Sequence, residues 1–236
     1  MKDLNRNFPR ALPDLIYLLD RDYPKKSSIE IVGNRYSLSA DERMILYRGV
    51  FRTELCLSRR EKLRSAESVG GSVLVVDGCN VLITLESYLS GRRVFRALDG
   101  FVRDTAGVYG NYRFGEGSMR STLLLLEFAE RFRPCRLVVY LDSPVSGSGE
   151  YAHRLRGMLD ERKLEGVVEA VKSPDRRILK EHTGDPVGEY VGEYVASSDT
   201  VIIDGVASCV DVPGLIIREV FGGEPLDLGN MAGPSR

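Results

Sequence analysis

The sequence predicts an α/β fold, namely a three-layer α/β/α parallel sheet of about five strands preceded by a small, mainly helical N-terminal module. Three observations carry this prediction. Short, continuous apolar runs are typical of strands covered on both faces. Helical stretches separate these runs. The charge also divides the chain, because residues 1–66 hold 14 Lys+Arg and 9 Asp+Glu (+5), whereas residues 67–236 hold 19 and 25 (−6).

The expected strands are apolar runs at 73–76, 137–141, 166–171, 201–203 and 215–217. Helical stretches between them cover about 81–108, with a break near Gly91, and then 118–132, 149–164, 175–182 and 187–195. Alternation of strands and helices predicts a parallel sheet with helices on both faces.

Residues 1–68 form the expected basic module, which ends at a small-residue hinge around 68–71. An apolar stripe predicts a helix at 12–19, and two short runs at 29–32 and 36–38 predict a hairpin. A capping box at 39–42 begins the next helix, which continues to about residue 51. A further helix at 54–65 carries several basic residues, which form either a solvated face or a phosphate-contacting face. The α/β domain is expected over 69–222 and a loose tail over 223–236.

Composition excludes several classes of protein. The net charge of −1 gives no global field that favours a nucleic acid or a membrane. No apolar run is long enough to span a bilayer, and residues 1–10 lack the core of a signal peptide, so we expect a cytoplasmic protein without a membrane partner. Four scattered cysteines form no Cys/His cluster, which disfavours a zinc site. The oligomeric state stays open, a homodimer included.

Acidic residues follow most of the predicted strands. Asp77, Asp142 and Asp175 come after the first three, Asp204 follows the fourth, and Asp199 lies just before the fourth. Each aspartate alone could be a helix N-cap. Strand ends of a parallel sheet meet at one edge, however, and clustered carboxylates need a cation, for which oxygen ligands select Mg²⁺ or Mn²⁺. Such a site is typical of phosphodiester hydrolysis.

Residues 75–82, Val-Val-Asp-Gly-Cys-Asn-Val-Leu, resemble the first motif of the PIN and NYN-type nuclease superfamily, an apolar strand that ends in D-G-x-N. Residues 198–204 resemble its late acidic motif, and Asp175 falls where the superfamily carries its middle acid. The chain also resembles an uncharacterised archaeal family with a small N-terminal module and a PIN-like domain, of which D-S-P-V-S-G-S-G at 142–149 is the most distinctive segment.

This resemblance implies a sheet of order 3-2-1-4-5, divalent metal and RNA cleavage. It implies that Asp77, Asp175 and Asp204 are catalytic and face the metal, with Asp199 as an alternative to Asp204. Asp142, after the second strand, is a further candidate metal ligand at a position less regularly acidic in that superfamily. Asn80 would cap the following helix or hold a metal-bound water. The long segment between the first two strands departs from the superfamily pattern.

Two further segments are candidates for substrate binding. One interleaves arginines with aromatic residues, which favours either single-stranded nucleic acid or the core of an amphipathic helix pair; its candidates are Arg92, Arg93, Arg113 and Arg120. The other is a Gly/Ser turn that opens a helix, where Ser146, Ser148 and Arg154 could hold a phosphate or, through a loose G-x-G pattern, a dinucleotide.

The sequence as a whole favours a metal-dependent ribonuclease or RNA-processing protein that uses Mg²⁺ or Mn²⁺. A non-catalytic PIN-like module that binds RNA or protein is the alternative, and a nucleotide-binding enzyme is the third hypothesis.

Overall fold

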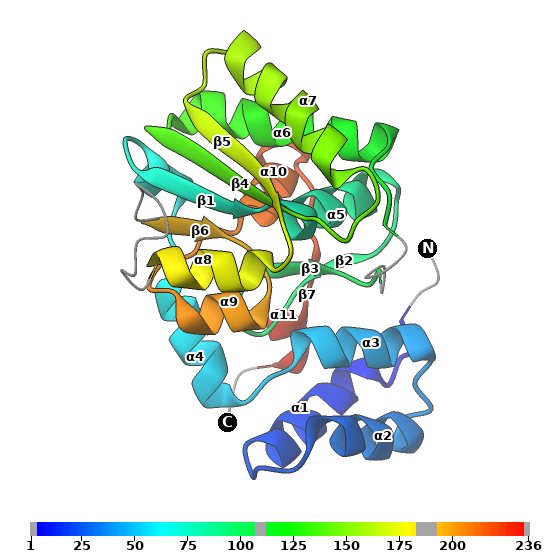
Figure 1. Ribbon diagram of the computed structural model, residues 1–236. Helices are drawn as coiled ribbons and strands as arrows, with labels where there is room; N and C mark the ends of the chain where they lie inside the picture. The colour runs from blue at the N-terminus through cyan, green and yellow to red at the C-terminus, as the bar shows by residue number, and fades with distance from the viewer. Residues whose placement is uncertain (1–3, 107–111, 183–192, 234–236) are drawn as a thin grey trace.

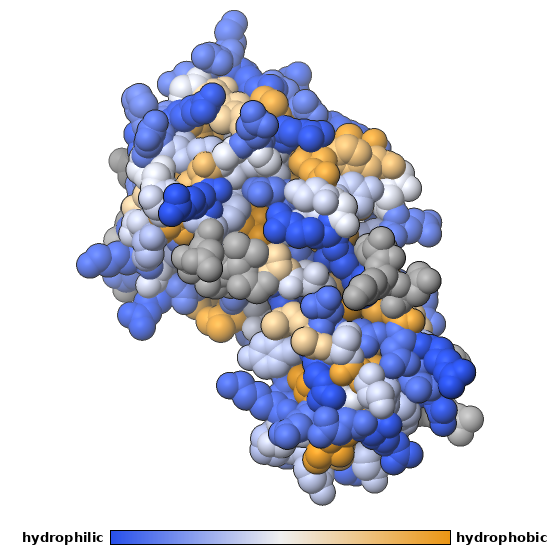
Figure 2. Space-filling view, turned by 90° about the vertical axis from the view of Figure 1, so that its right-hand side faces the viewer, coloured by the Kyte–Doolittle hydropathy of each residue, from blue (hydrophilic) through white to orange (hydrophobic). Residues whose placement is uncertain are grey.

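The computed structural model describes residues 4–106, 112–182 and 193–233. Four helices make up the N-terminal module: α1 (Phe8–Leu19), α2 (Lys25–Arg35), α3 (Ala40–Gly49) and α4 (Thr53–Lys62). Ser39 caps α3 in the predicted capping box. The module lies beneath the α/β domain in Figure 1, and in Figure 2 it forms the lower lobe, whose surface is mainly hydrophilic with scattered apolar residues.

After the short 3-10 turn η1 (Ala66–Val69), the chain enters a parallel sheet with the order β5-β4-β1-β6 (Figure 1). Its strands are β1 (Val73–Asp77), β4 (Arg136–Asp142), β5 (Gly166–Val171) and β6 (Tyr194–Ala196). Val76 of β1 is paired with Val139 of β4 on one side and with Ala196 of β6 on the other. Numbered along the chain, the strands have the order 3-2-1-4.

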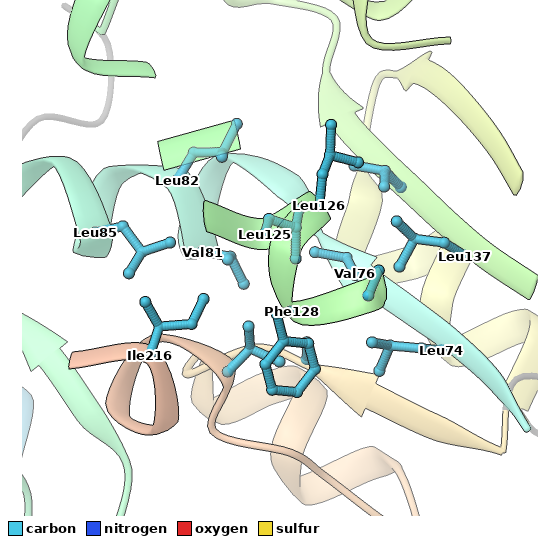
Figure 3. Close-up of a cluster of buried hydrophobic side chains, with 14 of the residues drawn as sticks. Leu74, Val76, Val81, Leu82, Leu85, Leu125, Leu126, Phe128, Leu137 and Ile216 are labelled. Atoms are coloured by element: carbon cyan, nitrogen blue, oxygen red, sulfur yellow. The ribbon is translucent and has the colours of Figure 1, made fainter. Parts of the chain in front are cut away.

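Helices cover both faces of this sheet, which confirms the predicted three-layer architecture. On one face lie α5 (Gly78–Leu89), α6 (Glu116–Phe132), α7 (Ser148–Glu161) and α10 (Val212–Phe221). Leu74 and Val76 point into this layer, as the core in Figure 3 shows. Val75 points to the opposite face, which α8 (Pro174–His182) and α9 (Thr200–Gly205) cover. Alternate residues of β1 therefore bury both faces.

Two of the predicted strands are wrong, because residues 201–203 lie in α9 and residues 215–217 lie in α10. The side chain of Asp199 accepts hydrogen bonds from backbone N–H groups of α9, and Asp211 caps α10 in the same way. Three apolar residues in a row do not distinguish a buried strand from a short buried helix, so the caps decide the outcome. Within the described residues, the parallel sheet consequently has four strands rather than the expected five.

Other local predictions also need correction. The predicted hairpin at 29–38 is helix α2 and the turn after it, with Ile29 and Val32 buried one helical turn apart. The helix predicted for 81–108 ends at Leu89 and is followed by an antiparallel pair, β2 (Val94–Arg96) and β3 (Val102–Asp104). Of the helix predicted for 187–195, residues 187–192 lie outside the described residues, and the remainder falls largely in β6.

The segment expected to be a loose tail is ordered over most of its length. Strand β7 (Leu226–Asp227) pairs parallel with β2, and α11 (Leu228–Ala232) follows it. Leu228 is fully buried in the core of the N-terminal module, together with Phe95 and Leu98 from the β2–β3 pair. The end of the α/β domain therefore completes the core of the module.

No helix in the described part of the chain is long and apolar enough to cross a membrane.

Truncation of Leu228 tests this packing. We expect Leu228→Ala to lower the free energy of unfolding by about 2–5 kcal/mol, because it leaves a cavity between the module and the C-terminal segment. Urea unfolding measures the change. The matched control is Val220→Ala on α10, whose side chain is 54% exposed and whose loss should cost less than about 0.5 kcal/mol. Equal effects of the two substitutions would contradict the proposed packing.

Candidate functional site

The carboxyl ends of the parallel strands bring several acidic residues to one edge of the sheet. Asp77 is the last residue of β1, and Asp142 is the last residue of β4. Asp199 follows β6 after two serines, and Asp175 lies in the first turn of α8, which follows β5. All four strands thus lead to an aspartate at the edge where ligands of open α/β sheets bind.

Asp77 is the most buried of these carboxylates, with 6% of the residue exposed. Its Oδ2 accepts a hydrogen bond of 2.9 Å from Ser197 Oγ. Burial is the main cause that raises the pKa of Asp77 to about 7; the Ser197 hydrogen bond opposes this rise, and the negative charges of Asp142 and Asp199 add to it. The carboxyl group therefore titrates near neutral pH.

Gly78 explains how α5 can begin directly after Asp77. A Cβ atom at this position would lie 2.6 Å from Leu141 Cδ2 and 2.9 Å from the carbonyl oxygen of Tyr140. The helix therefore starts in close contact with β4, which only glycine permits. This contact holds Asp77 and the first turn of α5 against the end of the neighbouring strand.

Asn80 holds the turn between β6 and α9. Its side-chain oxygen accepts hydrogen bonds from the backbone N–H of Ser198 at 2.9 Å and from Ser198 Oγ at 3.0 Å. The sequence analysis predicted that Asn80 either caps the helix that follows it or binds a water molecule that is coordinated to a metal. Asn80 instead links the first turn of α5 to the turn that carries Asp199, so it helps to position this acidic residue at the edge.

Asp142 and Asp175 form the other half of the acidic edge. Asp142 is half-buried, and its backbone N–H lies 3.5 Å from Cys79 Sγ. Burial raises the pKa of the Asp142 carboxyl group, and the negative charge of Asp175 adds to this effect. The two side chains are therefore close enough to interact electrostatically.

These four acids differ in their partners from the fully buried Asp99. Within the described residues, no arginine, lysine or histidine forms an ion pair with Asp77, Asp142, Asp175 or Asp199. By contrast, Asp99 pairs with two buried arginines.

The described ranges also contain no group of three or more His, Cys, Asp or Glu side chains arranged to hold a metal ion. The edge is acidic, but its carboxylates do not converge on one point.

Asp204, predicted to end a strand and face the metal, lies instead in α9. Both of its carboxylate oxygens accept hydrogen bonds from Arg59, at 2.6 and 2.8 Å. The correction follows from the position of the fourth strand, which ends at Ala196, so that Asp199 rather than Asp204 follows it. The Ser-Asp-Thr sequence before an apolar run is the signal of a helix N-cap that could have indicated this.

The remaining predicted binding residues lie elsewhere on the molecule. Arg92 and Arg93 line a cavity of about 690 Å³ beside the N-terminal module, and Arg113 and Arg120 are exposed. Phe95, Phe101 and Tyr112, which alternate with the arginines, are buried, so the core interpretation holds for these rings. Tyr109, another aromatic residue of this segment, lies outside the described residues.

The Gly/Ser turn precedes α7, as predicted. Gly147 has a φ of 81°, which favours glycine, and Ser148 Oγ donates a hydrogen bond of 3.3 Å to the carbonyl oxygen of Ser143. Ser146 and Arg154 are exposed. This hydrogen bond within the turn explains the serine at position 148 without a ligand.

A second cavity adjoins the acidic edge and was missed by the sequence analysis. It has a volume of about 560 Å³ and lies between the N-terminal module and the β6–α9 turn. Its lining on the acidic side includes Asn80, Ser198 and Asp199, and its basic residues are Lys25, Arg48, Arg59 and Arg103. These residues come from distant parts of the chain, so no local pattern could have grouped them.

Comparison with known proteins shows the family. Residues 66–215 match the model described as Domain of unknown function (DUF5616), and residues 4–62 match Protein of unknown function (DUF434). An uncharacterized protein of Methanocaldococcus jannaschii is 32% identical over 194 residues, which is 82% of this chain and 88% of the relative. No solved structure matches the chain. The chain belongs to the DUF5616 family.

The contrast between Asp77 and Asp99 can be tested by unfolding at different pH values. The folded-state pKa of Asp77, about 7, lies above its ordinary value of 3.8, so this group contributes stability at low pH that is lost as the pH rises from about 4 to 7. We expect Asp77→Asn to raise the free energy of unfolding at pH 8 by about 1–4 kcal/mol, with a smaller gain at pH 5.

Asp99→Asn is the matched substitution with the opposite sign. It leaves the buried guanidinium groups of Arg59 and Arg103 without their shared partner, so we expect a loss of about 3–5 kcal/mol. Urea unfolding at both pH values measures the two variants. Destabilisation by Asp77→Asn at pH 8 would refute the assignment of an uncompensated carboxylate at the sheet edge.

Proposed function

We propose that the protein is a metal-dependent ribonuclease, in which the acidic edge of the sheet hydrolyses phosphodiester bonds with Mg²⁺ or Mn²⁺. The observation that carries the proposal is the set of four aspartates without cationic partners, Asp77, Asp142, Asp175 and Asp199, at the carboxyl ends of the parallel strands. Carboxylate side chains that form no ion pair with arginine or lysine can be neutralised by a bound metal cation.

The chemistry of the donor set fits a hard divalent ion. Asp77 and Asp199 flank one side of the edge, and Asp142 and Asp175 flank the other. Mg²⁺ in enzymes that act on phosphates is usually held by one or two carboxylates, with water and phosphate oxygens as its other ligands, so a closed cage of protein ligands is not required. When bound, such an ion would activate water and stabilise charge on the phosphate.

Two features of the chain support the comparison with PIN-like nucleases. The strand order 3-2-1-4 agrees with the first four positions of the order 3-2-1-4-5 that the resemblance implies. Asp77, Gly78 and Asn80 occupy the end of the first strand and the start of the next helix, where the D-G-x-N motif would place them. We therefore propose a PIN-like catalytic domain that lacks the fifth strand within the described residues.

A non-catalytic binding module is the second candidate. Two observations favour it: Asp199 caps α9 through the N–H groups of Val201 and Ile202, and the described residues hold no preformed metal cluster. In this alternative the same fold would bind RNA or a protein without cleaving it, and the acids would serve as caps and turn residues.

Cleavage of single-stranded RNA with Mn²⁺ distinguishes the two functions. We expect the wild-type protein to cleave, and both Asp77→Asn and Asp142→Asn to lower the rate by at least about 100-fold, because each removes a carboxylate that would hold the ion. Gel analysis of a labelled RNA measures the rate, with and without EDTA.

Asp160→Asn is the control, since this aspartate is exposed on α7, away from the ends of the strands. It should cleave like the wild type. Far-UV circular dichroism checks that all variants keep their fold. Cleavage that survives in EDTA or in Asp77→Asn would exclude the proposed mechanism, and wild-type protein that binds RNA but never cleaves it would favour the non-catalytic module.

A further inference from the structure

We propose that the 560 Å³ cavity between the N-terminal module and the acidic edge binds one nucleotide unit of single-stranded RNA, with its phosphate on Lys25 and its base against Tyr47. The inference rests on the proposed function, because it names the subsite that would hold substrate beside the acids. It assigns a role to the N-terminal module, which would form one wall of the substrate site.

The position of the cavity is the first argument. Lys25 begins α2, and Tyr47 and Arg48 lie on α3, so the module forms one wall. Ser198 and Asp199 form part of the opposite wall, at the end of β6. A chain bound in the cavity would therefore continue directly to the acidic edge. The volume also falls within the range of small-ligand sites, about 300–1,000 Å³.

The second argument concerns the charge balance of the lining. Arg103 is fixed by Asp99 at 2.6 and 2.9 Å, and Arg48 by Asp104 at 3.1 Å. Lys25 differs, since no hydrogen bond or ion pair to its Nζ is found among the described residues. The ammonium group instead lies 3.9 Å from the ring centre of Phe51.

An amine without an acidic partner, in a cavity that it shares with three arginines, is suited to an anion. Burial and the positive charges of Arg103 and Arg59 lower the pKa of Lys25 to about 7. A bound phosphate would offset this repulsion and favour the charged amine. The cavity therefore has the features of a phosphate site in which the Lys25 amine becomes fully protonated when the anion binds.

The third argument is the apolar part of the lining. Tyr47 is 46% exposed and Met44 is 36% exposed, although both are large apolar side chains on a helix that packs into the module. Both border the same cavity as Lys25. An exposed aromatic ring beside a cationic site is the arrangement that single-stranded nucleic acids use for base stacking, worth about 1–3 kcal/mol per base.

Binding in EDTA tests the proposal apart from catalysis. Fluorescence anisotropy measures the affinity of the full chain for a short, labelled, single-stranded RNA. We expect Lys25→Met to weaken binding about tenfold or more and Tyr47→Ala about fivefold or more. Lys26→Met is the matched control, because Lys26 is the next residue of α2, is exposed and does not line the cavity; its effect should stay below about twofold.

Competition identifies the ligand chemistry. A nucleoside monophosphate should displace the RNA from the wild type at lower concentration than inorganic phosphate, and the unphosphorylated nucleoside should displace it least. Equal competition by phosphate and nucleoside monophosphate would exclude the stacking role of Tyr47. Thermal unfolding checks each variant, and Tyr47→Ala, a change at an exposed side chain, keeps the test valid if Lys25→Met fails to fold.

The outcomes separate this inference from the proposed function. RNA binding that depends on Lys25 in a protein that never cleaves RNA would support the subsite and overturn the nuclease. Mn²⁺-dependent cleavage together with equal RNA binding by Lys25→Met and Lys26→Met would support the nuclease and overturn the subsite.

The pH dependence of binding gives a further expected result. Around Lys25 lie Arg48, Arg59 and Arg103, the carboxylates of Asp99 and Asp199, the thiol of Cys56 and the hydroxyl of Tyr47. Because the free amine loses its proton near pH 7, we expect RNA affinity to fall by about tenfold between pH 7 and pH 9. In Lys25→Met this fall should disappear, and an unchanged pH profile would contradict the role of the amine.

Discussion

The arrangement of the two parts of the chain depends on one buried ion network around Asp99. This carboxylate is fully buried and accepts hydrogen bonds from Arg103 at 2.6 and 2.9 Å and from Arg59 at 3.2 Å. Arg59 also holds Asp204, and Arg103 donates to the carbonyl oxygen of Ser198 at 2.9 Å. The network thereby joins α4 of the N-terminal module to the β2–β3 pair, to α9 and to the turn that carries Asp199. It fixes the walls of the cavity beside the acidic edge.

A buried network of this kind is a weak source of net stability, because removing each charge from water costs several kcal/mol. The network instead fixes the relative positions of the helices that it joins. Guanidinium groups that bind two carboxylates in a fixed orientation leave few alternative positions for α4 and α9. Lys62 adds to the same contact, since its Nζ donates to the carbonyl oxygens of Ile203 and Asp204 at the end of α9. The basic face of the helix predicted at 54–65 therefore serves, in part, to attach the module to the α/β domain.

How far the sequence predicts this molecule depends on the range of the interactions involved. The strands around 73–76 and 137–141 and the position of Asp77 at a strand end were predicted because short, continuous apolar runs and the Asp-Gly turn are local signals. The run at 201–203 was misassigned, because what decides between strand and helix there is a cap from Asp199 and the packing of α9 against the sheet. The place of Asp204 was wrong for the same reason.

The residues that line the cavity show more clearly which contacts cannot be predicted from the sequence. Arg59 belongs to a segment that was interpreted as a solvated or phosphate-contacting face, and Arg103 to a segment expected to be helical. Their shared partner, Asp99, lies between two short strands that the apolar pattern did not reveal. Pairing across 40 residues, as between Arg59 and Asp99, leaves no periodicity in the sequence. Burial of Leu228 by the N-terminal module is likewise a long-range effect, invisible in a Gly- and Pro-rich tail.

The acidic edge and the basic cavity are best understood together. Four aspartates without cationic partners would repel the phosphates of an RNA chain, and by themselves they offer no means of attracting a substrate. The module brings Lys25, Arg48 and Arg59 to a cavity that Arg103 and Asp199 of the α/β domain also line, and the three arginines are already paired with Asp99 and Asp104. In this proposal, a positively charged subsite next to a carboxylate edge separates two tasks: the amine would attract a phosphate, and the carboxylates, which have no cationic partner among the described residues, would hold a cation at the neighbouring position. The proposal therefore makes a single site of the module and the α/β domain, and neither part would suffice alone.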